Sequence, residues 1–397
     1  MTRPRVLVLA GYFDWFSGYQ ETGLAAWLSR YATTEVVAGN RVSSMFSDAQ
    51  LAALGISRRY KTGTTEENGV RVTRLSTVEK RSMVWSTKAR AYIESQDYDL
   101  IIQVMPGQLL PFAGTLARNR AVRVVLYGDN SAMWSHLHFS KRVLKGAAFA
   151  VSKGVLYAAV NARADQVFGY TPNTVSRLRF FNSGKTMQVL PLAFDPERFY
   201  FDQRVRAEQR SKLGYTDSNI VVVAAGKIQA KKRLDLLLRA TMNLAPRYPE
   251  LRLLLTGIDE SDHAAELARQ VADSALLSER VRLIGFVEAQ ELNRVFNAAD
   301  IGVWPKMPAI TIQQAMGTGL KVAMPENDWV RHLIRPGSGS YFVDGGQDDT
   351  SDMERSIAAL AEDDDGFDGR VRRAEANAWL GADRVARSLL QWTGVGE

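Results

Sequence analysis

The chain has 397 residues, which is long for one hydrophobic core, so we expect two domains. Its 46% hydrophobic and 23% charged residues are typical of a globular protein, and a formal net charge of +7 favours phosphorylated ligands, polyanions or an anionic membrane surface as partners. Because the chain has no cysteine, disulfides, thiolate metal sites and cysteine nucleophiles are excluded, which suits the cytoplasm.

Other protein classes are disfavoured by motif and spacing. The four histidines lack any metal-binding spacing, and no apolar run is long enough to cross a bilayer. The first residues run directly into a short apolar strand, so we expect no signal peptide. The sequence also contains no motif of a known nucleic-acid-binding domain. We therefore predict no metal ion, no membrane span and no nucleic-acid partner.

The first half of the chain alternates apolar strands with helical segments. A strand over 6–10 leads into a loop containing Gly11 and Gly18, then a helix and a second strand over 35–38. Such a βαβ unit is parallel and right-handed by default. The glycines miss the dinucleotide-binding spacing, so the loop is either a plain turn or a binding loop for another ligand. Residues 43–67 are polar and predict no regular structure, whereas 69–75 alternate like a strand with one wet face.

Two further core strands are expected over 99–104 and 122–127, with a helix around 109–118 between them. The second strand ends in Gly128 and Asp129. An acidic residue just beyond the carboxyl end of a strand is well placed for catalysis, and it can equally cap the next helix. We take Asp129 as a candidate catalytic base with that alternative open.

Residues 133–160 mix basic, aromatic and aliphatic side chains, and include His136 and His138. This pattern is typical of a helix on an anionic membrane surface, and also of a core helix with lysines that extend to solvent. The run 146–151 is apolar almost all round, which favours the core helix.

The second half repeats the alternation of strands and helices after a boundary marked by prolines and by the charged run 198–212. The predicted strands of this half span 220–225, 251–256, 281–284, 300–304, 322–324 and 340–343. Two successive doubly wound α/β domains are therefore expected, with ligands at the carboxyl ends of the strands.

The loop after the strand 220–225 is the most informative stretch. It opens with Gly226, and four basic residues follow, namely Lys227, Lys231, Lys232 and Arg233. A glycine lets the backbone approach a ligand closely, and the cations favour an anion there. Spacing alone leaves an ordinary solvated basic loop equally open.

Ordered motifs make the second half resemble glycosyltransferase family 4, a class of nucleotide-sugar transferases with the GT-B fold. The matching segments are Gly226–Lys227 with Lys232 and Asp235–Leu236–Leu237; Leu253–Gly257; Val281–Val287; Ala299–Val303; and Gln314–Val322. The first half is similar only through Pro191–Leu192, Asp195 and Phe199. The resemblance implies two Rossmann-like domains facing each other across a cleft: an acceptor domain over 1–205, a nucleotide-sugar domain over 206–375, and a C-terminal helix over 376–397 returning to the first domain.

The same resemblance implies roles for individual residues. Lys227 and Lys232 would contact the donor diphosphate and stabilise its growing charge without a metal cofactor. The remaining donor-binding candidates are Gly18, Gly226, Gly257, Phe286, Val287, Ile310, Thr311 and Gln314. His136 and His138 are candidate acceptor-binding residues, and Asp129 would replace a histidine that the family carries at that strand end.

Two departures from the family pattern concern the donor site. The family carries two glutamates where this chain has Lys306 and Gln314. Gln314 keeps hydrogen-bonding capacity without charge, and Lys306 reverses the charge. These changes are compatible with a divergent transferase, an altered donor or a lost activity.

We therefore expect a cytoplasmic glycosyltransferase, with possible peripheral contact at the inner face of an anionic membrane. It would move a hexose-type sugar from a nucleotide donor to a saccharide, lipid-linked or small-molecule acceptor in bacterial cell-surface polysaccharide biosynthesis, with retention at the anomeric carbon. The alternatives are a catalytically inactive saccharide- or nucleotide-binding protein on this fold and a nucleotide-sugar epimerase.

Overall fold

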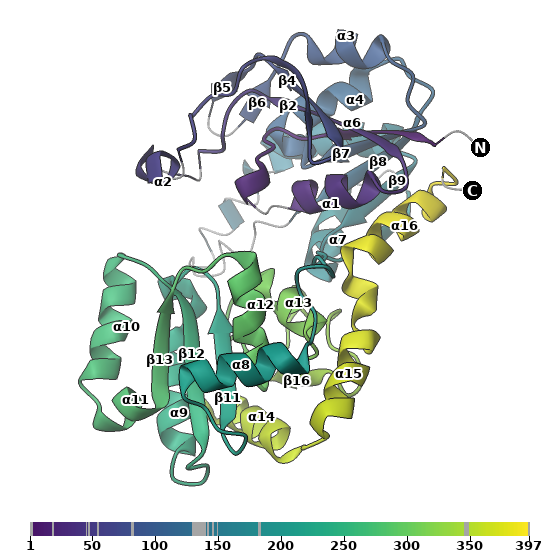
Figure 1. Cartoon of the computed structure of the whole chain (residues 1–397). Helices are drawn as coiled ribbons and strands as arrows, with labels where there is room; N and C mark the ends of the chain where they lie inside the picture. The colour runs from purple at the N-terminus through teal and green to yellow at the C-terminus, as the bar shows by residue number, and fades with distance from the viewer. Residues whose placement is uncertain are drawn as a thin grey trace. The chain divides into compact units, whose positions relative to one another are not determined.

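The structure, a computed structural model, divides into two compact units. Unit 1 comprises Met1–Pro191 and Ala382–Glu397, and unit 2 comprises Leu192–Gly381. Figure 1 traces the chain through both units from purple to yellow. The structure describes residues 3–17, 20–44, 46, 48–53, 55–80, 83–128, 140, 143–144, 147–148, 150–181, 184–344 and 349–395.

An eight-stranded sheet organises unit 1, in the order β10-β9-β8-β7-β1-β2-β4-β3. Its strands are β1 (Arg5–Leu9), β2 (Thr33–Gly39), β3 (Gly63–Glu67), β4 (Val70–Leu75), β7 (Leu100–Val104), β8 (Val122–Tyr127), β9 (Gln166–Gly169) and β10 (Met187–Val189). Neighbouring strands are parallel except for β3 and β4. A separate antiparallel pair joins β5 (Val78–Lys80) to β6 (Met83–Trp85).

The helices of unit 1 come from both ends of the chain. They are α1 (Gln20–Leu28), α2 (Asp48–Ala53), α3 (Ala89–Glu94), α4 (Ala113–Leu116), α6 (Val155–Arg163), α7 (Pro172–Leu178) and α16 (Ala382–Trp392). Helix α16 packs against α1, as Figure 1 shows, and the Trp392 ring stacks on Phe168 with 5.5 Å between ring centroids. The last helix of the chain is thus part of the first unit.

Unit 2 is built on a fully parallel six-stranded sheet in the order β13-β12-β11-β14-β15-β16. Its strands are β11 (Ile220–Ala225), β12 (Leu251–Ile258), β13 (Val281–Gly285), β14 (Ile301–Val303), β15 (Lys321–Pro325) and β16 (Gly339–Phe342). Its helices are α8 (Gln203–Leu213), α9 (Leu234–Leu244), α10 (Asp262–Ala272), α11 (Ala275–Arg280), α12 (Ala289–Ala298), α13 (Thr311–Gly317), α14 (Ser351–Glu362) and α15 (Gly366–Ala376).

Strand β11 shows why its sequence is apolar at every position. Val222 and Ala224 pack into a core with α9, α10 and α14, whereas Val221 and Val223 pack into a second core with α12 and α13. Successive side chains of a strand point to opposite faces, so a strand covered on both faces needs apolar residues throughout. The expected doubly wound α/β architecture is confirmed.

Two expectations for the first half were wrong. Residues 43–67, expected to be irregular, contain α2 and β3. Strand β4 has no wet face, because only Arg71 is exposed along it. Arg74, on the same strand, is buried. Its guanidinium donates to the Phe13 carbonyl oxygen at 2.9 Å and forms an ion pair with Glu67 at 3.5 Å. Polar residues that find such partners can lie inside the fold, which periodicity does not reveal.

The expected core helix around 146–151 was also wrong for the residues that can be assessed. Ala147, Ala148 and Val151 are exposed. The inward-facing positions belong instead to Gly154, Tyr157 and Val160 in the turn and helix that follow. Across the described part of the chain, no helix combines the length and the apolar character needed to cross a membrane.

Candidate functional site

The loop that joins β11 to α9 brings Lys232 over the end of the strand. Gly226 has a positive φ of +116°, and a Cβ atom built on it would lie only 2.8 Å from Lys232 Nζ. Glycine adopts this backbone conformation readily, and it leaves the space that the lysine occupies. The ammonium group is therefore positioned directly above the backbone at the carboxyl end of β11.

A second glycine holds the end of β12 against this loop. Gly257 has φ of +102°, and a Cβ atom there would lie 2.6 Å from the Gly226 carbonyl oxygen. The Gly226 N–H donates to the Thr256 carbonyl oxygen at 3.2 Å. Gly226 and Gly257 thus allow two neighbouring strand ends to meet backbone to backbone.

Thr311, the first residue of α13, closes the site from the other side. Its hydroxyl donates to the Ala225 carbonyl oxygen at 2.9 Å and accepts from Trp304 Nε1 at 3.0 Å. All three residues are buried. This short hydrogen-bond chain ties the beginning of α13 to the end of β11.

Lys232 is the most unusual charge in this loop. Its side chain is half-buried, and it forms no hydrogen bond or ion pair with any residue that the structure describes. Burial, together with the neighbouring Lys231, lowers the pKa of Lys232 to about 8. A buried cation without a partner is costly, so the arrangement favours an anionic ligand.

The other basic residues of the loop are arranged differently. Lys227 and Lys231 are exposed. Arg233 adopts φ of +52° and places its guanidinium on both carboxylate oxygens of Asp235, at 2.9–3.0 Å. Lys227 remains available to a ligand at the surface, whereas Arg233 already has a carboxylate partner.

The two positions that depart from the family pattern lie on adjacent elements. Lys306, in the loop after β14, forms an ion pair with Asp344, which follows β16. Gln314 lies on α13, and its Oε1 atom is buried with no hydrogen-bond partner within the described part of the chain. Asp344 therefore offsets the reversed charge, and Gln314 offers an unused acceptor.

The remaining predicted residues occupy other places. Phe286 is 83% exposed just after β13, and Val287 beside it is half-buried. Ile310 is half-buried in the position that precedes α13. Gly18, Asp129, His136 and His138 lie outside the residues that the structure describes. The structure thus brings together Gly226, Lys232, Gly257 and Thr311. It does not bring the exposed Phe286 into contact with these four residues.

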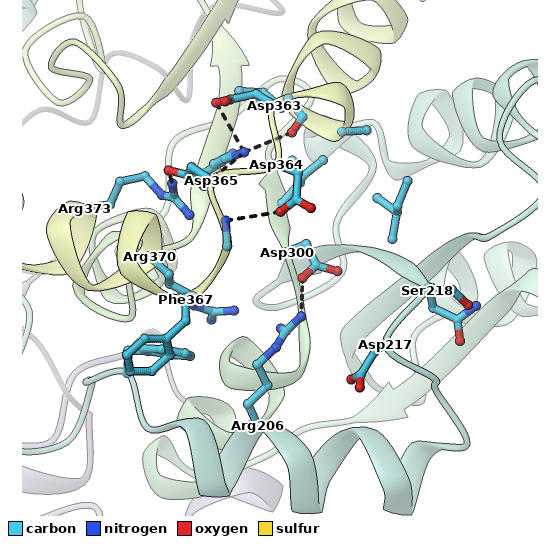
Figure 2. A pocket seen from close by; sticks show the side chains of 18 of the residues that line it. Arg206, Asp217, Ser218, Asp300, Asp363, Asp364, Asp365, Phe367, Arg370 and Arg373 are labelled. Carbon is cyan, nitrogen blue, oxygen red and sulfur yellow. Dashed lines mark hydrogen bonds and ion pairs between the residues drawn. The ribbon is translucent and has the colours of Figure 1, made fainter.

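Unit 2 also contains a cavity of about 430 Å³ at the opposite, amino-terminal edge of its sheet. Figure 2 shows its charged lining, with Arg206 directed at Asp300 and Asp365 beside Arg373. Phe367 lies at 5.5 Å from Phe201, measured between ring centroids. This cavity is the alternative to the β11 loop as a candidate ligand-binding site in unit 2.

The charges of this cavity are largely used within the fold. Asp300 accepts from Arg206 at 2.6 Å, from Arg210 at 3.2 Å and from the Val221 N–H at 2.8 Å. Buried Arg370 donates to the carbonyl oxygens of residues 296, 299 and 318 at 2.7–3.0 Å. Cations at carbonyls that end a helix are stabilising, and here Arg206 and Arg210 fasten the end of α12 to α8, while Arg370 fastens it to α15. We interpret the cavity as the surface of a structural network.

Sequence reasoning missed Trp304 and Asp344. Trp304 lies at the end of a predicted strand and precedes a proline. A buried indole N–H needs a hydrogen-bond partner, and this requirement was the signal that could have identified it. Asp344 carries no local signal, because its pairing with Lys306 spans 38 residues.

Residues 219–363 match the family model for glycosyl transferases group 1. A D-inositol 3-phosphate glycosyltransferase of Nocardia farcinica is 25% identical over 315 residues, which cover 70% of this chain and 68% of that protein. A GDP-mannose-dependent monoacylated alpha-(1-6)-phosphatidylinositol monomannoside mannosyltransferase of Corynebacterium glutamicum is 25% identical over 224 residues, or 54% of each chain. This chain thus spans about two thirds of the first relative and about half of the second.

Solved structures share the fold across nearly the whole chain. Anabaena Alr3699/HepE in complex with UDP has a TM-score of 0.69 at 18% identity, and the match covers 99% of this chain and 100% of that one. A protein described as a UDP-N-acetylglucosamine 2-epimerase from Listeria monocytogenes is more distant, with a TM-score of 0.53 at 13% identity over 98% of this chain and 95% of that one.

We predict that Gly257→Ala disturbs the junction of β11 and β12. The added methyl would meet the Gly226 carbonyl oxygen in a backbone conformation that alanine disfavours, so the free energy of unfolding should fall by roughly 1–3 kcal/mol. Urea unfolding measures this. Gly285→Ala is the matched control, because its methyl would lie at an ordinary 3.7 Å from the nearest atom, the Ile258 carbonyl oxygen. Equal stability of the two variants would contradict the prediction.

A second prediction concerns the structural network. Asp300→Asn should lower the free energy of unfolding by roughly 3 kcal/mol, because it removes the carboxylate that Arg206 and buried Arg210 share. Asp217→Asn, an exposed residue lining the same cavity, should change it by less than about 0.5 kcal/mol. Similar losses in both variants would show that the network is not what stabilises this edge.

Proposed function

We propose that this chain, a GT-B glycosyltransferase with a group 1 domain over residues 219–363, transfers a hexose-type sugar from a nucleoside diphosphate donor to an acceptor hydroxyl. The observation that carries the donor assignment is Lys232, a half-buried cation without a partner, held over Gly226 at the carboxyl end of β11. Open α/β sheets bind ligands at this edge, and the negative charge of a diphosphate would supply the anionic partner that Lys232 lacks.

The proposed chemistry needs little more than charge stabilisation. The bond between the anomeric carbon and the β-phosphate oxygen breaks, and the acceptor oxygen forms the new bond. Negative charge grows on the leaving diphosphate, where Lys232 and exposed Lys227 would stabilise it. We propose that no metal cofactor takes part, and that the departing phosphate oxygen receives the acceptor proton.

Residues beside the phosphate site suit the neutral part of the donor. The unpartnered Oε1 of Gln314 would accept a hydrogen bond from a ribose or sugar hydroxyl. The pair of Lys306 and Asp344 would offer a second polar contact from the neighbouring strand ends. Gly257, Phe286, Val287, Ile310 and Thr311 complete the donor assignment as proposals.

The donor and acceptor classes come from the relatives. HepE was crystallised with UDP-glucose, and the Corynebacterium relative is named for GDP-mannose and a phosphatidylinositol mannoside. We propose a nucleotide-sugar donor and a saccharide or lipid-linked acceptor, with a peripheral position at the inner face of a membrane. Asp129 remains our candidate catalytic residue in the first domain, and His136 and His138 remain our candidate acceptor-binding residues. The epimerase alternative is disfavoured, since its representative is only a distant neighbour in structure.

The donor assignment predicts the effect of Lys232→Ala. With UDP-glucose and GDP-mannose as trial donors and a panel of saccharide acceptors, kcat/KM should fall about 100-fold or more, because one electrostatic contact to the leaving group is lost. Lys231→Ala is the matched control: it removes an exposed neighbouring charge and should change kcat/KM less than about threefold. Equal effects in the two variants would contradict the site.

The pH dependence gives an independent prediction. Lys232 is charged in the free enzyme below its pKa of about 8, so kcat/KM should decline as the pH rises through that value. A bound diphosphate favours the charged form and should move the decline in kcat to higher pH. The residual activity of Lys232→Ala should lack this alkaline decline, and its persistence would assign the titration to another group.

Retention at the anomeric carbon is the expected stereochemical outcome. Proton NMR of the freshly formed product should show the same anomeric configuration as the donor sugar. An inverted product would overturn retention and favour a general base such as Asp129. Product formed from the donor without acceptor would instead revive the epimerase.

A further inference from the structure

Two lysines of unit 2 lie away from solvent in opposite electrostatic surroundings. Lys321 is buried, and its ammonium group pairs with Asp363 at 3.2 Å and with Asp365 at 3.5 Å. Lys232 is half-buried, and it has no carboxylate partner among the residues that the structure describes. Burial without a counter-charge disfavours the ammonium form, so Lys232 is the lysine to examine for chemistry of the neutral amine.

The loop around Lys232 keeps its amine without a partner. The Nζ atom lies over the backbone, only 2.8 Å from the position that a Cβ atom on Gly226 would take. The next residue, Arg233, turns with φ of +52° and directs its guanidinium to Asp235, so the nearest carboxylate in the sequence is already used. Burial, and then repulsion from the preceding Lys231, lower the pKa of Lys232 to about 8.

A lysine in these surroundings is a nucleophile close to neutral pH. At pH 8 about half of the Lys232 side chains are neutral, whereas a lysine with the ordinary pKa of about 10.4 is neutral in about 0.4% of molecules. A less basic amine is also a weaker nucleophile, and the trade-off known for thiols reduces the net advantage from about a hundredfold to about tenfold. Lys232 should therefore react about tenfold faster than an ordinary exposed lysine.

The charges of the loop indicate which electrophile suits this amine. Lys227 and Lys231 are exposed beside Lys232, at the carboxyl end of β11. An acyl phosphate is a small anion in which an activated acyl group is bonded to phosphate. Neighbouring cations attract such an anion, and they stabilise the charge of the phosphate as it leaves. An acyl phosphate thus combines the anion that the loop favours with a group that an amine can attack.

We propose that Lys232 is a site of acylation by acyl phosphates. The lone pair of the neutral Nζ atom forms a bond to the acyl carbon, the bond between that carbon and the phosphate oxygen breaks, and one amine proton passes to the departing phosphate. The amide product is uncharged, so acylation removes the cation that we assign to the leaving diphosphate and should switch off sugar transfer. This consequence rests on the proposed function, whereas the acylation itself does not.

The test is treatment of the full chain with acetyl phosphate at pH 8, with the acetylation of each lysine followed by peptide mass spectrometry. Lys232 should react about tenfold faster than exposed Lys231, and Lys321, with its two carboxylate partners, should react more slowly than either. Lys231→Glu should slow acetylation of Lys232 about threefold or more, because a carboxylate replaces a repelling cation. Equal rates at Lys232 and Lys231, or an unchanged rate in Lys231→Glu, would overturn the proposal.

Two controls identify the reacting group and the reagent. Lys232→Arg keeps the cation without a nucleophilic amine, so the acetylated peptide should disappear while the other lysines react as before. N-acetoxysuccinimide, an uncharged acetylating reagent, should prefer Lys232 over Lys231 less strongly than acetyl phosphate does. An equal preference would overturn the choice of acyl phosphates.

The failure of this proposal can be distinguished from that of the donor assignment. UDP or GDP bound at the loop should protect Lys232 from acetylation, because the diphosphate covers the amine and favours its charged form. Rapid acetylation of Lys232 that neither nucleotide slows would support the acylation site and contradict the donor assignment. Circular dichroism checks that Lys231→Glu and Lys232→Arg fold as the unchanged chain does.

Discussion

The proposed chemistry depends on the carboxyl edge of the second sheet, and this edge is shaped by two glycines that lack a side chain. Gly226 and Gly257 let the ends of β11 and β12 meet backbone to backbone, and a Cβ atom at either position would occupy space already filled. Lys232 lies in the space above Gly226, and Thr311 ties α13 to the same strand end. A ligand at this edge would therefore meet backbone, one cation and the beginning of a helix within a few ångströms.

Charge pairing separates this edge from the other side of the sheet. At the amino-terminal edge, Arg206, Arg210 and Arg370 donate to carbonyl oxygens, and Arg206 and Arg210 also pair with Asp300. At the carboxyl edge, Lys232 is half-buried with no partner among the residues described. Burying a charge is costly unless it is paired, so a satisfied network contributes to the fold, whereas an unsatisfied cation indicates a missing anion. The cavity at the amino-terminal edge is thus lined by a structural network, whereas the loop after β11 is the site that we propose for the donor.

The sequence by itself determined the α/β class, the positions of the strands along the second half and the glycine-and-lysine loop after β11, because strand periodicity and glycine positions are local properties. It could not predict the burial of Arg74, the contact of Trp304 with Thr311 or the pairing of Lys306 with Asp344, since each depends on residues far apart in the chain. Among the four basic residues of one loop, the family resemblance selected Lys227 and Lys232, and only the tertiary structure separated these two. Burial and the absence of a carboxylate partner distinguish Lys232, and both are properties of its surroundings.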